Sequence, residues 1–373
     1  MIERVAFPVR ARAVLCLMAA LGCSPAPRSV AADSRAAVPA AGLDSLEQER
    51  VTGVVGQRLD SLLSSFETRG FSGTVLVVQR GKILLSKGYG FANRESRVRN
   101  SPATRYELNS LTKMFTAAAI LQLAGEGKLR LDDPLEKHLG SFPAGKRSAT
   151  IEHLASHTGG LVVAGAPTDG SSRDAFVASM KATPLESAPG TKYRYTNAGY
   201  SMLAAVIEAA SGMGYEDYLR QRIFAPAGMR YAVFRNAVPG ADSLFARGYG
   251  PPDAALNPYV WGTIGAGGVW STMGDVYRWI VAVDDGSVVP AEFRQILFSP
   301  PRPPSREAYG WHVYPRTDST RYRIEKGGGS DLFATQLLRV PDEGLVIIWA
   351  SNDLTKRWRQ ELNRELSATA LRQ

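Results

Sequence analysis

Apolar residues near both ends of the chain are spaced in a way that predicts a single sheet built from the two termini. Residues 45–69 carry apolar positions at mostly three- to four-residue spacing, which predicts an amphipathic helix. Two strand-like runs, 73–79 and 82–87, flank Arg80-Gly81 and predict a β-hairpin. Near the other end, β-branched and aromatic runs precede a closing helix at 355–371. These runs predict strands at 309–314, 321–326, 333–340 and 345–350. We therefore expect an α+β fold with a single sheet assembled from the two ends of the chain.

Between these ends, the pattern changes to one that predicts an inserted, mostly helical region at about 128–264. Short turn signals separate apolar stretches with helical spacing in this region. The clearest predicted helices lie around 151–155, 174–181 and 199–210. A further helix is expected at 275–283, directly after the glycine-rich stretch 265–272.

The stretch 107–124 predicts a helix that is apolar on nearly all its faces and is therefore buried. Asn109 or Ser110 is expected to cap its first turn, and Gly125 is expected to end it. Ser110 and Lys113 are three residues apart, so they share one face of the first turn. Burial would lower the pKa of Lys113, and the helix N-terminus would favour negative charge beside Ser110. The pair predicts an activated acyl-transfer nucleophile, although a capping serine and a surface lysine would give the same pattern.

Composition and charge narrow the classes of protein that fit this chain. The 373 residues include 45% hydrophobic and 21% charged residues, as in ordinary globular proteins. The formal net charge is +9, but the basic residues are scattered and no nucleic-acid-binding motif is present, which argues against a nucleic-acid partner. His153 and His157 are four apart, yet no glutamate lies between them and no third ligand is evident, so we expect a packing role and no metal.

The N-terminal residues predict export. In residues 1–32, arginines precede an apolar run that is too short to span a bilayer as a mature helix, which is typical of a signal peptide. Two endings remain open. One is cleavage near Ala31, and the other is a lipoprotein signal that ends before Cys23 and leaves a lipid anchor on that residue. Residues 33–45 are expected to form a flexible tether, followed by one domain at 46–371. We expect a periplasmic, envelope-anchored or secreted bacterial protein.

Two further short motifs follow Ser110 and Lys113 along the chain. Tyr195-Thr-Asn197 precedes a predicted helix, and Lys326-Gly-Gly-Gly329 ends a predicted strand, where glycines allow a substrate backbone to approach closely. With these motifs in this order, the sequence resembles the serine β-lactamase and penicillin-binding-protein family. The similarity is greatest to the branch that contains class C β-lactamases, D-alanyl-D-alanine carboxypeptidases and related esterases. The resemblance covers roughly residues 46–370 and includes Phe71–Val77, Ile151–Leu161 and Gly265–Thr272.

The resemblance implies an antiparallel sheet flanked by helices, a helical second region and an active site at their junction. It also implies a role for each motif residue. Ser110 would be the acylated nucleophile and Lys113 its base or proton relay. Tyr195 would exchange a proton with the leaving group, its phenolate favoured by the nearby lysine charge, and which of Lys113 and Tyr195 is the main base stays open. Asn197 would orient the substrate and hold Lys113, and Lys326 could receive a substrate carboxylate. The backbone N–H groups of Ser110 and Gly329 would hold an oxyanion, Gly328 would line the substrate site, and no cofactor is implied.

Departures from the family pattern bear on the substrate. Gly327 replaces the threonine of the usual Lys-Thr-Gly motif, and Leu332 stands where a glycine often precedes the aromatic residue. We therefore expect hydrolysis of a D-amino-acid peptide or small ester more than of a β-lactam. The alternative is a catalytically silent envelope-binding protein that keeps the fold. The oligomeric state is not predicted.

Overall fold

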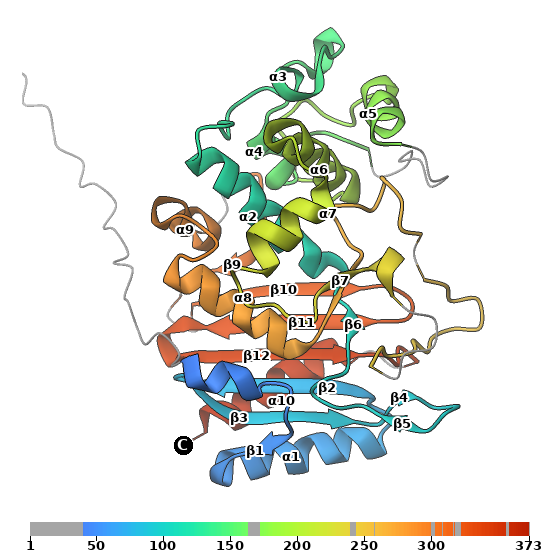
Figure 1. The fold of residues 1–373 in the computed structure, drawn as a ribbon, viewed down its shortest axis with the longest axis vertical. Helices are drawn as coiled ribbons and strands as arrows, with labels where there is room; N and C mark the ends of the chain where they lie inside the picture. Colours follow the sequence, from blue (N-terminus) through green and yellow to red (C-terminus); the bar gives the residue numbers. More distant parts are fainter. Residues whose placement is uncertain are drawn as a thin grey trace, which may run out of the picture. The chain divides into compact units, whose positions relative to one another are not determined.

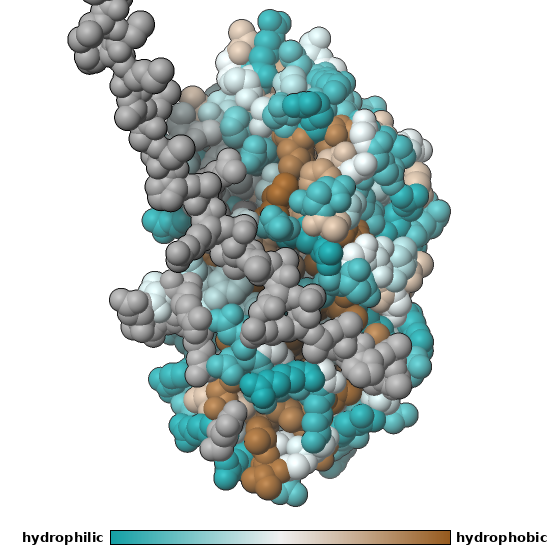
Figure 2. All heavy atoms as spheres, turned by 90° about the vertical axis from the view of Figure 1, so that its left-hand side faces the viewer, coloured by the Kyte–Doolittle hydropathy of each residue, from teal (hydrophilic) through white to brown (hydrophobic). Residues whose placement is uncertain are grey.

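The computed structural model describes residues 40–162, 172–238, 244–256, 258–299, 303–307, 309–315, 317, 322–355 and 358–372. The expected signal segment 1–32 and residues 33–39 of the expected tether lie outside these ranges, as does Cys23. None of the helices in the described part of the chain is both long and apolar enough to span a membrane. Figure 2 shows that hydrophilic side chains cover much of the described surface on one side of the molecule.

A seven-stranded antiparallel sheet forms the centre of the fold, with the strand order β1-β3-β2-β12-β11-β10-β9 (Figure 1). The strands are β1 (Arg50–Val51), β2 (Gly73–Gln79), β3 (Lys82–Tyr89), β9 (His312–Tyr314), β10 (Arg323–Gly329), β11 (Ala334–Val340) and β12 (Leu345–Ser351). The two ends of the chain meet where β2 pairs with β12, from Gly73 opposite Ser351 to Gln79 opposite Leu345. The expectation of a sheet built from both termini is confirmed.

The sheet separates two apolar cores. On one face, α1 (Gly53–Thr68) and α10 (Arg359–Leu371) pack over Val75 and Val77 of β2. Leu76 and Val78 alternate with these residues and belong to the larger core on the other face. That core holds α2 (Thr112–Gly125), whose side chains are buried almost all round, as its apolar pattern predicts. The N-terminal end of α2, which carries Lys113 and follows Ser110, therefore lies between the sheet and the helical region.

The helical region and the small sheets complete the domain (Figure 1). The remaining helices are α3 (Glu136–Leu139), α4 (Ile151–Ala155), α5 (Arg173–Ala182), α6 (Asn197–Ser211), α7 (Tyr215–Tyr218), α8 (Met273–Asp285) and α9 (Ala291–Phe298). Two strands, β4 (Phe91–Asn93) and β5 (Val98–Arg99), form a hairpin. A three-stranded sheet has the order β6-β8-β7 and contains β6 (Tyr106–Glu107), β8 (Val269–Ser271) and β7 (Val233–Phe234).

Three predicted helix ends are wrong, the first two for a local reason. The first helix begins at Gly53 rather than residue 45, because Gly53 has a φ of 66° and residues 50–51 pair with β3. The buried helix α2 was expected to end at Gly125, but Gly125 is still helical. The residue with the positive φ (69°) that follows the end of this helix is Gly127. The closing helix begins at Arg359 rather than residue 355.

Candidate active site

Ser110 lies in a 3₁₀ turn, Asn109–Leu111, that leads directly into α2. Neither Asn109 nor Ser110 caps the helix with its side chain, so that part of the prediction is wrong. Asn109 instead has a φ of 51°, in the left-handed region that asparagine tolerates better than most residues. This sharp change of direction turns the chain from β6 into α2 and leaves the Ser110 side chain at a pocket.

Lys113 is fully buried and its amine contacts three oxygen atoms. Its Nζ lies 3.1 Å from Ser110 Oγ, 2.8 Å from Asn197 Oδ1 and 3.0 Å from the carbonyl oxygen of Ala266. Burial, together with the positive charge of Lys326, lowers the pKa of Lys113 well below its usual value, in the direction that the sequence predicts. A neutral amine can donate to Asn197 and Ala266 through its two N–H bonds, and its lone pair then faces Ser110. This geometry suits a base.

Tyr195 places its hydroxyl 2.9 Å from Ser110 Oγ, on the segment that leads into α6. Its ring lies against the imidazole of His157, with the ring centroids 4.4 Å apart. Burial, with the negative charge of Glu307, raises the pKa of Tyr195. The phenolate that we expected is therefore wrong, because the prediction counted the nearby lysines but not the burial of the phenol or the carboxylate of Glu307. Tyr195 is a protonated phenol that donates to Ser110 Oγ.

Lys326 is 1% exposed, and its ammonium forms a buried ion pair with the carboxylate of Glu307. Burial alone would raise the pKa of Glu307, but the Lys326 charge and the neighbouring imidazole of His157 lower it well below its usual range. His157 Nε2 lies 3.6 Å and His312 Nε2 lies 3.2 Å from the two oxygens of this carboxylate. Lys326 is therefore engaged by a protein carboxylate, contrary to our expectation of a free cation for substrate. No sequence motif marks Glu307.

The two histidines that raised the question of zinc have structural partners. His153 completes a capping box with Thr150 at the start of α4. His157 accepts a hydrogen bond at Nδ1 from the backbone N–H of Thr196 (3.3 Å), so its proton is on Nε2, which faces Glu307. Burial lowers the pKa of His157 to about 4, which leaves the ring uncharged at neutral pH.

At two of the glycines after Lys326, atoms of neighbouring residues lie where a side chain would start. A Cβ atom at Gly328 would lie 2.4 Å from the carbonyl oxygen of Leu108. A Cβ atom at Gly327 would lie 3.0 Å from the guanidinium of Arg359, which donates to the Gly328 carbonyl at 2.5 Å. A side chain at this position would meet the Arg359 guanidinium, which would have to shift to make room. Gly329 ends β10 opposite Ala334 and lines the pocket beside Ser110.

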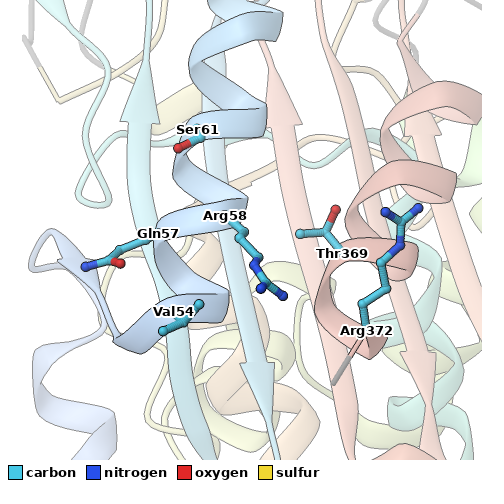
Figure 3. A pocket seen from close by; sticks show the side chains of 6 residues that line it. All are labelled: Val54, Gln57, Arg58, Ser61, Thr369 and Arg372. Atoms are coloured by element: carbon cyan, nitrogen blue, oxygen red, sulfur yellow. The ribbon is translucent and has the colours of Figure 1, made fainter.

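A narrow pocket of about 60 Å³ opens beside Ser110. It is lined by Glu107, Asn109, Ser110, Asn197, Arg235, Pro258, Tyr259, Thr263, Ala266, Gly267, Gly268 and Gly329. A larger pocket of about 420 Å³ lies between α1 and α10 (Figure 3). Ser61 lines this pocket, but no lysine or tyrosine that could activate a serine is among its lining residues. We therefore place the chemistry at the narrow pocket. The sequence did not single out Glu107 or Arg235, because no short motif links them.

The structure brings the predicted site residues together, although their roles stay predictions. Ser110, Lys113, Tyr195 and Asn197 form one connected set of contacts. Lys326 joins this set through the Tyr195 ring, whose centroid lies 5.5 Å from Lys326 Nζ.

Comparison with known proteins identifies the family. The β-lactamase family profile matches residues 43–371. The protein PbpX of Bacillus subtilis is 32% identical over 249 residues, which cover 66% of this chain and 62% of PbpX. Protein flp of Staphylococcus aureus (strain NCTC 8325) is 27% identical over 329 residues, which cover 81% of this chain and 64% of flp. The matched part therefore spans less than two thirds of the length of either relative.

A solved structure supports the same fold. The β-lactamase/D-alanine carboxypeptidase from Pseudomonas syringae superposes with a TM-score of 0.74 at 19% identity, covering 86% of this chain and 99% of that one. At this identity the similarity bears on the fold alone. Since the family profile spans nearly the whole described domain, the chain belongs to the β-lactamase family.

Proposed function

We propose that this protein is a serine hydrolase that forms an acyl-enzyme at Ser110 and releases it with water. One observation carries the proposal: Ser110 Oγ lies between the amine of Lys113, at 3.1 Å, and the hydroxyl of Tyr195, at 2.9 Å. The first group has a lowered pKa and the second a raised one, so a base and an acid flank the same oxygen. A protein that only binds a ligand does not need a base and an acid on either side of one serine oxygen.

In the first half of the reaction, Lys113 accepts the Ser110 proton while Oγ attacks the substrate carbonyl carbon. The backbone N–H groups of Ser110 and Gly329 would hold the resulting oxyanion, where losing one donor typically costs about 10²–10³ in rate. Tyr195 then donates its proton as the bond to the leaving group breaks, and the Lys113 ammonium restores that proton. In the second half, water attacks the ester carbonyl, and Ser110 leaves with a proton, which regenerates the free enzyme.

For the substrate, we propose a D-amino-acid peptide or a small ester ahead of a β-lactam. The Lys326–Glu307 pair supports a neutral small ester over a β-lactam, because a lysine paired with a buried carboxylate attracts a substrate carboxylate less strongly than a free lysine does. The glycine at position 327 also lacks a hydroxyl that could contact that carboxylate.

We also propose that the protein is exported, from the signal-like residues 1–32. Mass spectrometry of the protein purified from bacterial envelopes would distinguish cleavage near Ala31 from a lipid on Cys23. An intact N-terminus would reject both endings.

The experiment for the catalytic proposal is covalent labelling with a fluorophosphonate probe and with fluorescent penicillin, read by mass spectrometry. Ser110→Ala should abolish the adduct while circular dichroism shows a folded protein. Ser61→Ala is the matched control, because Ser61 lines the other pocket, and it should label like the wild type. Turnover of nitrocefin, p-nitrophenyl acetate and a D-Ala-D-Ala peptide, measured side by side, ranks the substrates. An adduct that persists in Ser110→Ala would reject the nucleophile, and no adduct in the wild type would favour a binding protein.

A further inference from the structure

Arg235 is the basic residue among those that line the pocket beside Ser110 in the described part of the chain. It follows β7, and its backbone N–H donates to the Gly268 carbonyl oxygen at 2.9 Å, which fixes its position. Its side chain is 18% exposed and reaches toward Glu107, whose side chain is 3% exposed. Because β8 lies between β6 and β7, the small sheet brings Glu107 and Arg235 to the same pocket.

This ion pair leaves hydrogen-bonding capacity unused. Arg235 Nη1 lies 3.6 Å from Glu107 Oε1, which is longer than a hydrogen bond. Both Arg235 Nη1 and Glu107 Oε2 are buried without a hydrogen-bond partner among the described residues. Burial also raises the pKa of Glu107, although Arg235 opposes that effect. An unpaired buried N–H is costly, so a ligand oxygen that reached this guanidinium would be bound favourably.

The cation that sequence reasoning assigned to carboxylate recognition is already occupied. Lys326 is 1% exposed and paired with Glu307, whereas Arg235 lines the pocket and its buried Nη1 has no hydrogen-bond partner among the described residues. A guanidinium also presents two parallel N–H groups that match the two oxygens of a carboxylate, which an ammonium cannot do. An anionic group in this pocket would therefore find Arg235 rather than Lys326.

The residues that line the pocket indicate which part of a substrate it would hold. Its lining includes Ser110 and Asn197 but does not include Tyr195, the group that we assign to the leaving group. The pocket therefore lies on the side of the acyl group that stays on Ser110.

Resting on the proposed serine hydrolase function, we propose that Arg235 is a specificity-determining residue that receives a carboxylate on the acyl part of the substrate. Glu107 holds the guanidinium in orientation until the ligand arrives. The substrates are then esters or amides of acids that carry a second carboxylate, such as dicarboxylic acid monoesters or acyl groups with an acidic side chain.

The experiment compares 4-nitrophenyl monoesters of succinic, glutaric and adipic acids with neutral esters in which an isopropyl group replaces the terminal carboxylate. The measured quantity is the ratio of kcat/KM for each anionic ester to that for its neutral counterpart, after subtraction of spontaneous hydrolysis. In Arg235→Gln this ratio should fall roughly 10- to 100-fold for the best-fitting chain length. Arg58→Gln, an exposed arginine in the pocket of Figure 3, is the matched control and should keep the wild-type ratio.

A second variant covers the case in which Arg235→Gln does not fold because Glu107 is left buried and unpaired. Glu107→Gln/Arg235→Gln removes both charges and should lose the preference for the anionic ester as well. An unchanged ratio in the double variant, or a wild type that prefers the neutral esters, would overturn the proposal.

Binding measurements separate this proposal from the catalytic one. Calorimetric titration of Ser110→Ala with glutarate and adipate should give binding that weakens at least about 10-fold in Ser110→Ala/Arg235→Gln. If the wild type hydrolyses none of the esters, the covalent-labelling experiment still decides the catalytic proposal, and this titration alone decides the role of Arg235. Equal binding by the two proteins would refute it.

Discussion

Removing the charge of Lys326 should move the pH at which Ser110 becomes reactive. Lys113 must be neutral to accept the Ser110 proton, so the labelling rate should rise with pH through the pKa of Lys113. The Lys326 charge is one of the causes that lower this pKa, after burial. Without that charge, the pKa rises, and the acidic limb of the profile should move to higher pH.

The size of this shift follows from the geometry. Lys113 Nζ lies 5.0 Å and Lys326 Nζ lies 5.5 Å from the centroid of the same Tyr195 ring. The two amines are therefore separated by at most roughly 10 Å, at which two unit charges repel by about 1.5 kcal/mol in an effective dielectric constant of about 20. That energy corresponds to a shift of about one pH unit in the acidic limb. Glu307 acts on Lys113 with the opposite sign to Lys326, because its negative charge raises the pKa of that amine.

The assay is the second-order rate constant for fluorophosphonate labelling, measured across pH and normalised to its plateau. Lys326→Met/Glu307→Gln removes both charges together, so its limb should move less than that of Lys326→Met. The double variant also avoids a lone buried carboxylate, which would cost about 3–5 kcal/mol of stability. A limb that moves to lower pH in Lys326→Met, or one that moves as far in the double variant as in the single one, would refute the electrostatic reasoning.

Three further predictions concern other parts of the site. Tyr195→Phe should slow hydrolysis of a peptide amide by about 10²–10⁴, but slow a 4-nitrophenyl ester much less, because nitrophenolate leaves without a proton; equal losses in kcat would argue against an acid role. The depressed pKa of His157, about 4, means that the unfolded chain takes up a proton that the folded protein excludes as pH falls from the usual value of 6.5 toward 4. From about pH 7 to about pH 5, urea denaturation should therefore show the wild type losing about 2 kcal/mol more stability than His157→Gln. Gly328→Ala should reduce labelling and lower the melting temperature, because its Cβ would lie 2.4 Å from the Leu108 carbonyl oxygen and 2.5 Å from Thr335 Oγ1; a wild-type melting curve would show that the strand can shift.

Local sequence signals predicted the hairpin well and the first helix poorly. The β2–β3 hairpin follows from two strand-like runs around Arg80-Gly81, where both residues adopt positive φ values of 47° and 78°. The same kind of spacing failed before α1, because Leu46 continues the apolar pattern yet packs in the core on the opposite face of the sheet. Periodicity cannot report that the chain changes direction at Gly53.

The candidate site divides in the same way. Ser110 and Lys113 are neighbours through helical spacing, so the sequence alone places them together. Tyr195 and Lys326 were assigned through family motifs, since contacts across the fold have no local signature. Arg235 and Glu307 belong to no motif and reach the site only through the paired strands and buried segments of the folded chain.

Burial and the carboxylate of Glu307 together reverse one chemical inference, and with it the assignment of acid and base. From the sequence, two lysines near Tyr195 favoured a phenolate, which would make Tyr195 a base that competes with Lys113. In the structure, Glu307 pairs with Lys326 and adds negative charge near the Tyr195 ring, which together with burial keeps the phenol protonated. The positive charge that remains near Lys113 still lowers the pKa of that amine. Burial therefore does most to separate the two proton-transfer roles, since it lowers the pKa of Lys113 and raises that of Tyr195. Glu307 adds to the shift at Tyr195 and opposes the shift at Lys113, so Lys113 stays the group that accepts and Tyr195 the group that donates.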